Sequence, residues 1–148
     1  MDKIRDLIDR LPLFREFTDD ERDHLAQQEH TFIRFEPNEF IIREGAREKS
    51  FYILIKGAVR VTRNDMPDQP LAVLKSGAIF GEISFLTRAA RTTNVIAHEE
   101  ASVVMRLDSD ILQAMSPIVR EKIKDHLIHL LAARINKMND SLLQLSRR

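Results

Sequence analysis

Apolar residues recur at helical spacing in both end regions of the chain and at strand-like spacing between them. Over residues 1–30 they lie three or four positions apart, which predicts an N-terminal helical region. Within it, Thr18 and Glu21 have the spacing of a capping box and predict the start of a helix at that point. Residues 31–107 instead contain short, strand-length runs of apolar residues bounded by turn residues, which predicts strands.

The four glycines support the same division of the chain. They occupy positions 45, 57, 77 and 81, each where a predicted strand meets a turn. Many short strands with such turns are typical of a sandwich or jelly roll. We therefore predict a mainly β fold with flanking helices: an antiparallel β-roll or jelly-roll barrel, an N-terminal helical bundle and two C-terminal helices.

The C-terminal region, residues 108–148, has helical periodicity again. Asp108 or Ser109 is placed to cap a short helix, and Pro117 suits the first turn of the next one. In that last helix, apolar residues alternate three and four positions apart, as in a coiled coil. They are Ile128, Leu131, Ile135, Met138, Leu142 and Leu145. The helix either lies along its own domain or pairs with a second copy, and we predict a homodimer.

Composition narrows the class of protein. The 148 residues carry a formal net charge of zero, whereas a duplex nucleic-acid binder normally has a positive excess. There is no cysteine, and no apolar run is long enough to span a bilayer. No recognition-helix unit follows the last predicted helix. We therefore expect a single cytoplasmic domain that contacts neither nucleic acid nor membrane.

The segment 80–95, with the sequence FGEISFLTRAARTTNV, concentrates the candidate chemistry. Gly81 allows a sharp turn before a short helix, whose first amides favour an anion. Arg91 adds a planar fork suited to phosphate oxygens, although a salt bridge to an acid is its ordinary alternative. Ionised Glu82 only accepts hydrogen bonds and so favours hydroxyl or N–H donors. The segment therefore fits a sugar phosphate.

The same segment resembles the phosphate-binding cassette of cyclic-nucleotide-binding domains, as in cyclic-AMP-dependent kinase regulatory subunits, catabolite activator proteins and nucleotide-gated channels. The glycines also fall where that family has its glycines. The resemblance implies one nucleotide-binding domain over residues 1–148, with helices at 1–30, a β-roll at 31–107 that contains the cassette 80–95, and helices at 108–148.

Roles for the cassette residues follow from this resemblance. It implies that Arg91 pairs with the exocyclic phosphate oxygens and that Glu82, with the Gly81 carbonyl, accepts a hydrogen bond from the ribose 2′-hydroxyl. Ile83 and Ser84 would donate backbone N–H groups to the phosphate. These five residues form the core of the expected ligand site.

The resemblance implies further contacts around the base. Thr92 and Thr93 would lie beside the ligand, with the Thr92 hydroxyl near the base. Val73 and Leu74 either form an apolar floor under the purine or belong to the core. Arg134 either stacks on the purine or lies on a solvated helix face.

Two residues bear on which ligand is bound. Thr92 after the arginine resembles cyclic-GMP-selective members, yet we expect cyclic AMP first and cyclic GMP second. Lys49 stands where the family often has an acid that orients the cassette arginine, so the partner of Arg91 must be another group, with Glu48 as candidate. The alternative is a degenerate domain that acts through protein contacts or binds another ligand such as cyclic di-GMP.

The sequence gives little support for a catalytic function. His126 and His129 lie three apart on a predicted helix, but no nearby carboxylate completes a metal site. No nucleophile elbow or Ser/His/Asp arrangement is evident. We therefore expect no enzyme, no metal and no cofactor other than the nucleotide ligand.

Overall fold

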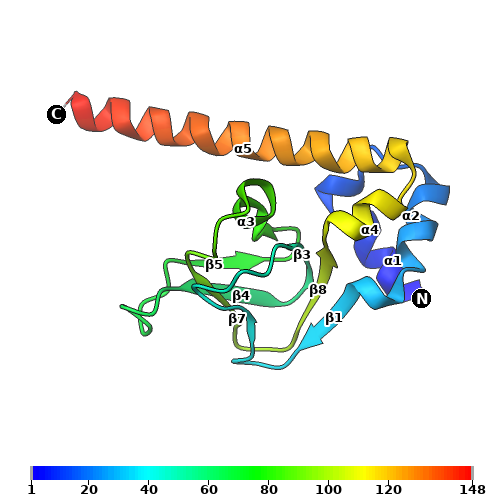
Figure 1. The fold of residues 1–148 in the computed structure, drawn as a ribbon, viewed down its shortest axis with the longest axis horizontal. Coiled ribbons are helices and arrows are strands. Elements are labelled where there is room, and N and C mark those ends of the chain that lie inside the picture. Colours follow the sequence, from blue (N-terminus) through cyan, green and yellow to red (C-terminus); the bar gives the residue numbers. More distant parts are fainter. Residues whose placement is uncertain (1, 148) are drawn as a thin grey trace. The chain divides into compact units, whose positions relative to one another are not determined.

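The computed structural model describes residues 2–147 (Figure 1). The chain divides between Ala114 and Met115 into two compact units. The first unit holds the N-terminal helices and all of the strands, and the second holds the last helix.

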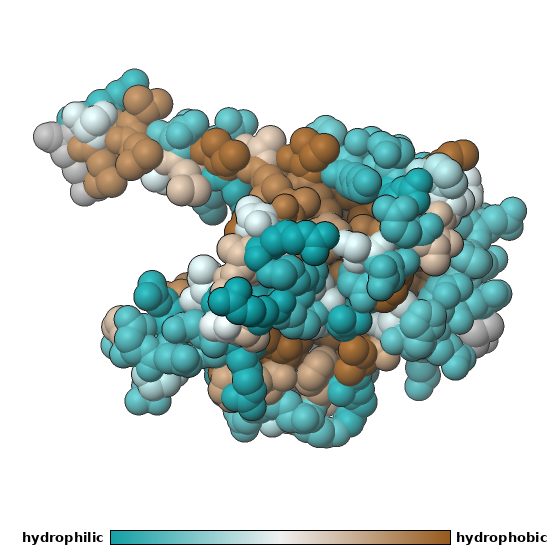
Figure 2. Space-filling model, in the orientation of Figure 1, coloured by the Kyte–Doolittle hydropathy of each residue, from teal (hydrophilic) through white to brown (hydrophobic). Residues whose placement is uncertain are grey.

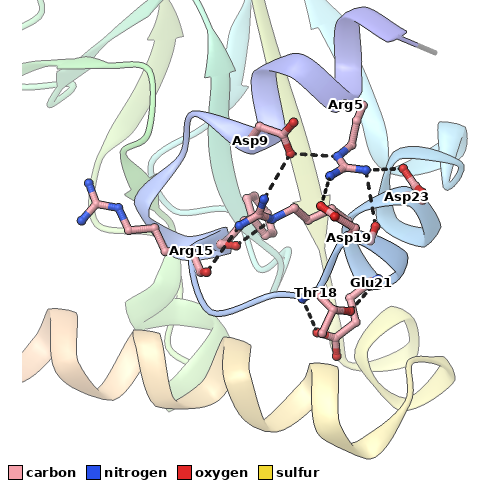
Figure 3. Close-up of polar contacts among 9 residues, drawn as sticks. Arg5, Asp9, Arg15, Thr18, Asp19, Glu21 and Asp23 are labelled. Carbon is pink, nitrogen blue, oxygen red and sulfur yellow. Dashed lines mark hydrogen bonds and ion pairs between the residues drawn. The ribbon is translucent and has the colours of Figure 1, made fainter.

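The N-terminal region is helical, as predicted. The Thr18 backbone N–H donates to Oε1 of Glu21 (2.8 Å), and the Glu21 N–H donates to Oγ1 of Thr18 (3.2 Å), so the predicted capping box is confirmed (Figure 3). Arg5 links the first helix to the second through aspartate side chains of both. The elements are α1 (Asp2–Asp9), the 3-10 turn η1 (Pro12–Phe14), α2 (Asp19–Ala26) and the 3-10 turn η2 (Glu29–Thr31).

The strands form two four-stranded antiparallel sheets, in the orders β1-β8-β3-β6 and β2-β7-β4-β5. The predicted antiparallel β-roll with flanking helices is therefore confirmed, as two sheets rather than one closed barrel within the described residues. The strands are β1 (Phe32–Phe35), β2 (Phe40–Ile42), β3 (Phe51–Lys56), β4 (Ala58–Thr62), β5 (Ala72–Lys75), β6 (Ile79–Phe80), β7 (Asn94–Ala97) and β8 (Ser102–Leu107).

The core between the sheets draws on both of them. Alternate residues of β3 point into it, and Tyr52 stacks on Phe80 with ring centroids 5.3 Å apart. Burial of such side chains contributes about 1.5–3 kcal/mol each. The buried cluster contains Ile42, Tyr52, Leu54, Val59, Phe80, Val95 and Val104.

Strand β3 is covered on both faces, because its first five residues are all buried. Its other face carries Phe51, which packs edge-to-face on Phe85 with centroids 4.8 Å apart. Phe85 belongs to α3 (Glu82–Thr87), the helix that follows β6. This contact anchors α3 to the central strand of its sheet.

Helix α4 (Ser109–Ala114) ends the first unit. The Ile111 N–H donates to Oδ1 of Asp108 (2.8 Å), so Asp108 is the cap that the sequence proposed.

The second unit is formed by α5 (Pro117–Ser146), with Pro117 in its first turn as predicted. Most of the predicted heptad positions of α5 are exposed, and Figure 2 shows apolar side chains in brown along this helix. The exposed members are Ile128, Ile135, Met138, Leu142 and Leu145.

Candidate functional site

The turn before α3 depends on a glycine. Gly81 adopts φ +78°, a left-handed conformation that side chains rarely tolerate. A Cβ atom there would lie 3.0 Å from Nη1 of Arg91 and 3.2 Å from the carbonyl oxygen of Ser50. The remaining three glycines also have positive φ, as their predicted positions at turns require.

Arg91 is buried beneath this turn, with only 3% of its side chain exposed. Its Nη1 donates to the carbonyl oxygen of Gly81 (2.8 Å), and its Nη2 donates to the carbonyl oxygen of Ser50 (2.5 Å). Its backbone pairs with the loop after β2, since the Arg91 N–H donates to Ala46 (2.8 Å) and the Gly45 N–H donates to Arg91 (2.7 Å). The guanidinium is thus held in one place from several directions.

Arg91 forms an ion pair with a carboxylate. Its Nη2 lies 2.5 Å from Oε2 of Glu48. The salt bridge to an acid that the sequence left open for Arg91 is therefore present, and the acid is Glu48. Burial tends to raise the pKa of the Glu48 carboxyl, but hydrogen bonds from Ser50 and Arg91 outweigh it and hold the pKa below its usual value. Glu48 is therefore ionised near neutral pH.

One buried donor of Arg91 has no hydrogen-bond partner. Among the described residues, Nε of Arg91 is buried and has no partner. Buried polar groups are normally paired, because an unpaired one costs about 1–3 kcal/mol. An anion that accepts from the guanidinium would remove this cost, so the residues present fit a phosphate.

Lys49 does not contact Arg91. Its Nζ donates to the carbonyl oxygen of Arg88, the residue that caps the C-terminal end of α3 with φ +65°. A cation there compensates the carbonyls at the end of the helix. Glu48 and Ser50 therefore contact Arg91, and Lys49 contacts Arg88. Glu48 is the acid beside Arg91, as the sequence suggested.

The predicted cassette residues are grouped around α3. Glu82 and Ser84 are buried, with 3% and 6% exposure, whereas the Ile83 side chain is 52% exposed. The Ile83 side chain is therefore not part of the core. The backbone N–H groups of Ile83 and Ser84 lie in the first turn of α3.

The other predicted site residues lie outside α3. Thr92 is exposed and Thr93 half-buried, directly after Arg91. On β5, Val73 is 46% exposed, whereas Leu74 packs against the core between the sheets. Arg134 lies on α5, in the second unit, and is exposed.

Two residues of the site carried no recognised signal in the sequence. Ser50 contributes its backbone carbonyl, which any residue type could supply. Arg106 lies on β8, where its Nε is 3.3 Å from Oε1 of Glu48. A charged residue at an inward-facing position of an apolar strand was the available signal for Arg106.

Potential metal ligands and the length of the helices bear on two other kinds of function. Within residues 2–147, no group of three or more potential ligands could hold a metal ion. Burial, together with the neighbouring His129, lowers the pKa of His126, which favours its neutral form. No helix in the described part of the chain has the length and apolarity to cross a membrane.

Comparison with known proteins agrees with this geometry. The chain is 41% identical over 80 residues to the cyclic nucleotide-gated channel beta-3 of Canis lupus familiaris, covering 52% of this chain and 10% of the channel. It is 27% identical over 111 residues to a cAMP-dependent protein kinase regulatory subunit of Pyricularia oryzae, covering 75% of this chain and 28% of the subunit. The chain thus spans less than a third of either relative.

Among solved structures, the catabolite activator protein of Thermus thermophilus superposes with a TM-score of 0.71 at 27% identity, covering 91% of this chain and 63% of that one. The family model of the cyclic nucleotide-binding domain matches residues 32–116, more than half of the sequence. This stretch runs from the first strand through α4 and contains the whole cassette. The chain belongs to the cyclic nucleotide-binding domain family.

Proposed function

We propose that residues 1–148 form one regulatory module that binds a cyclic mononucleotide, cyclic AMP first and cyclic GMP second. The observation that carries the proposal is the buried Arg91, held by Gly81 and Ser50 carbonyls and left with an unpaired Nε. A cyclic phosphate has one negative charge and exocyclic oxygens that accept from such a guanidinium.

The ligand would lie across the cassette. Its phosphate accepts from Arg91 and from the backbone N–H groups of Ile83 and Ser84, while Glu82 accepts from the ribose 2′-hydroxyl. The Gly81 carbonyl already accepts from Arg91 (2.8 Å) and from the Phe85 N–H (3.3 Å), so Glu82 would be the main acceptor for the ribose hydroxyl. This arrangement is supported by the burial of Glu82, the first residue of α3, and of Arg91, which contacts the Gly81 turn before it.

Base selection would rest on the residues around the purine. The exposed Thr92 hydroxyl is available to a guanine amino group, and it favours cyclic GMP as the second candidate. Similarity of 34% over 79 residues to human cGMP-dependent protein kinase 2 points the same way. Thr93, the apolar Val73 and Leu74, and Arg134 as a stacking partner would complete the surroundings of the base.

The output of the module would be a movement of α5. This helix exposes a coiled-coil seam, with Ile128 63% and Met138 65% exposed. Ile at two of the three alternate seam positions (Ile128 and Ile135) and Leu at two of the three others favour two-stranded pairing, so we propose a homodimer through α5. Analytical ultracentrifugation that finds only monomer at high concentration would contradict this part.

The module would act by binding alone, in the cytoplasm and with neither catalysis nor nucleic-acid contact of its own. The alternative, a degenerate domain that uses protein contacts or cyclic di-GMP, drew its support from Lys49. Because Glu48 takes the place of the absent acid beside Arg91, that support is weaker.

Isothermal titration with cyclic AMP, cyclic GMP and cyclic di-GMP tests the proposal. We expect saturable one-site binding of at least one of the two mononucleotides. Folded protein that binds neither of them defeats the proposal, and binding of cyclic di-GMP alone establishes the alternative. Thr92→Ala should weaken cyclic GMP more than cyclic AMP, because one hydroxyl contributes about 1 kcal/mol.

A further inference from the structure

Glu48 contacts two arginines at once. Its Oε2 is 2.5 Å from Nη2 of Arg91, and its Oε1 is 3.3 Å from Nε of Arg106. The Ser50 backbone N–H also donates to Oε1 (3.0 Å), which fixes the carboxylate between the two cations. The strands behind them hold Arg106 opposite Tyr52.

The same contacts continue to the start of α4. Nη1 of Arg106 is 3.3 Å from Oδ2 of Asp108. The other oxygen of Asp108 accepts from the Ile111 N–H (2.8 Å), the bond that caps α4. Charges of alternating sign therefore run without a break from the cassette arginine to the first turn of a helix.

We propose that Glu48 and Arg106 are positioning residues that hold Arg91 for its anion and link it to the α4 cap through Asp108. The ligand part of this inference rests on the proposed function, whereas the link itself is a property of the protein without ligand. Neither residue needs to touch the ligand.

Charge balance explains why the second arginine matters. Arg91, Glu48, Arg106 and Asp108 together have no net charge. Without Arg106 the group would be negative before any phosphate arrived, and Glu48 would lose one of its two cationic partners. Because Arg106 is partly exposed and acts on Arg91 only through Glu48, we expect about a 3- to 10-fold loss of nucleotide affinity in Arg106→Gln.

The link also predicts a response in the protein without ligand. The Arg91 N–H, bonded to Ala46, and the Ile111 N–H, bonded to Asp108, report on its two ends. In Arg106→Gln, hydrogen exchange followed by NMR should become faster at both amides. Faster exchange at Ile111 alone would mean that Arg106 only supports the nearby cap, and this outcome overturns the link.

Two further variants control this experiment. Arg34→Gln removes an arginine of β1, a strand paired with β8, whose contact is the exposed Glu36, and it should change neither amide. Arg106→Lys keeps the charge but loses the planar fork that reaches Glu48 and Asp108. It should retain more affinity than Arg106→Gln, and it serves as the test variant if Arg106→Gln does not fold.

A double-mutant cycle decides whether Arg106 acts through Glu48. Titration of cyclic AMP into wild type, Glu48→Gln, Arg106→Gln and the double variant should show that Arg106→Gln has little further effect once Glu48 is neutral. The loss of cyclic AMP affinity in Arg106→Gln should also become smaller as the salt concentration rises from about 50 to about 500 mM, because salt screens charge interactions. An equal loss in both backgrounds overturns the inference.

Failure of this inference and failure of the proposed function remain distinguishable. If wild type binds no mononucleotide, the proposed function is wrong. Hydrogen exchange in the ligand-free variants, repeated in the Glu48→Gln background, then still decides whether the link exists. If wild type binds and Arg106→Gln binds equally well, only the link is wrong.

Discussion

Arg5 and Arg91 lie in the same unit and are held by their neighbours in opposite ways. Arg5 contacts three carboxylates at the surface of the N-terminal helices (Figure 3), from Asp9, Asp19 and Asp23. Arg91 is buried and contacts two backbone carbonyls and one carboxylate, which it shares with a second arginine.

This difference separates an arginine used for folding from one prepared for an anion. Three carboxylates more than neutralise Arg5, so a further anion would be repelled. Two carbonyl oxygens hold the guanidinium of Arg91 in place, and the Glu48 carboxylate that contacts it is shared with Arg106, so Arg91 is not surrounded by excess negative charge. The number of carboxylates around a buried arginine thus indicates whether it can still bind a phosphate.

The largest expected effect comes from removal of Arg91. Arg91→Ala should weaken cyclic nucleotide binding by about 2–5 kcal/mol, because the buried phosphate loses its charged partner. Isothermal titration measures this loss. Arg63→Ala, which removes an exposed arginine paired with Asp65, is the control and should bind normally. Unchanged affinity in folded Arg91→Ala would show that the anion is held elsewhere.

The fold was accessible from sequence because it depends on local signals. The capping box at Thr18, the glycines at turns and the strand-length run at 102–107 each specify local backbone geometry, and each is observed. The pairing of strands into two sheets depends on contacts between distant residues, and the pattern alone left a barrel equally open.

The candidate site was predictable only in part. Gly81 and Arg91 were identified because a motif fixes their spacing, and the structure brings them into contact. Arg106 was not identified, because it reaches the cassette through Glu48 from a strand that is remote in sequence. The Ser50 carbonyl was inaccessible to any argument from side chains.

A smaller effect is expected at the helix cap beside the Arg5 group. Thr18→Ala removes the hydroxyl that accepts from the Glu21 N–H, which should lower the free energy of unfolding by about 1 kcal/mol. Urea unfolding followed by circular dichroism measures it. Nucleotide affinity should not change, because this region serves folding. Thr18→Ser, which keeps an accepting oxygen, should recover most of the stability.

Arg5→Ala tests directly whether Arg5 contributes to stability and not to nucleotide binding. Without the cation, three neighbouring aspartates repel one another, so the urea midpoint should fall in low salt and recover toward the wild-type value in 1 M NaCl. Cyclic nucleotide affinity should equal that of wild type. A loss of affinity as large as that of Arg91→Ala would mean that the two arginines do not have separate tasks.

The smallest expected effect is the pH dependence of the Glu48 contact. The pKa of Glu48 is lowered in the folded protein, so its stabilisation is present above the unfolded value of about 4.3 and is lost as pH falls through the folded value. Since 37% of the Glu48 side chain is exposed, solvent screens the pair, and we expect less than about 1 kcal/mol.

Urea unfolding of wild type and Glu48→Gln at pH 7 and at pH 3 measures this contribution. The difference between the two proteins should be largest at pH 7 and smaller at pH 3, because Glu48 takes up its proton as the pH falls through its folded-state pKa. Other carboxylates titrate in both proteins and cancel in the difference. A difference that is equal at both pH values would mean that Glu48 stabilises the cassette through the shape of its side chain, and its charge would then not be what sets Arg91 apart from Arg5.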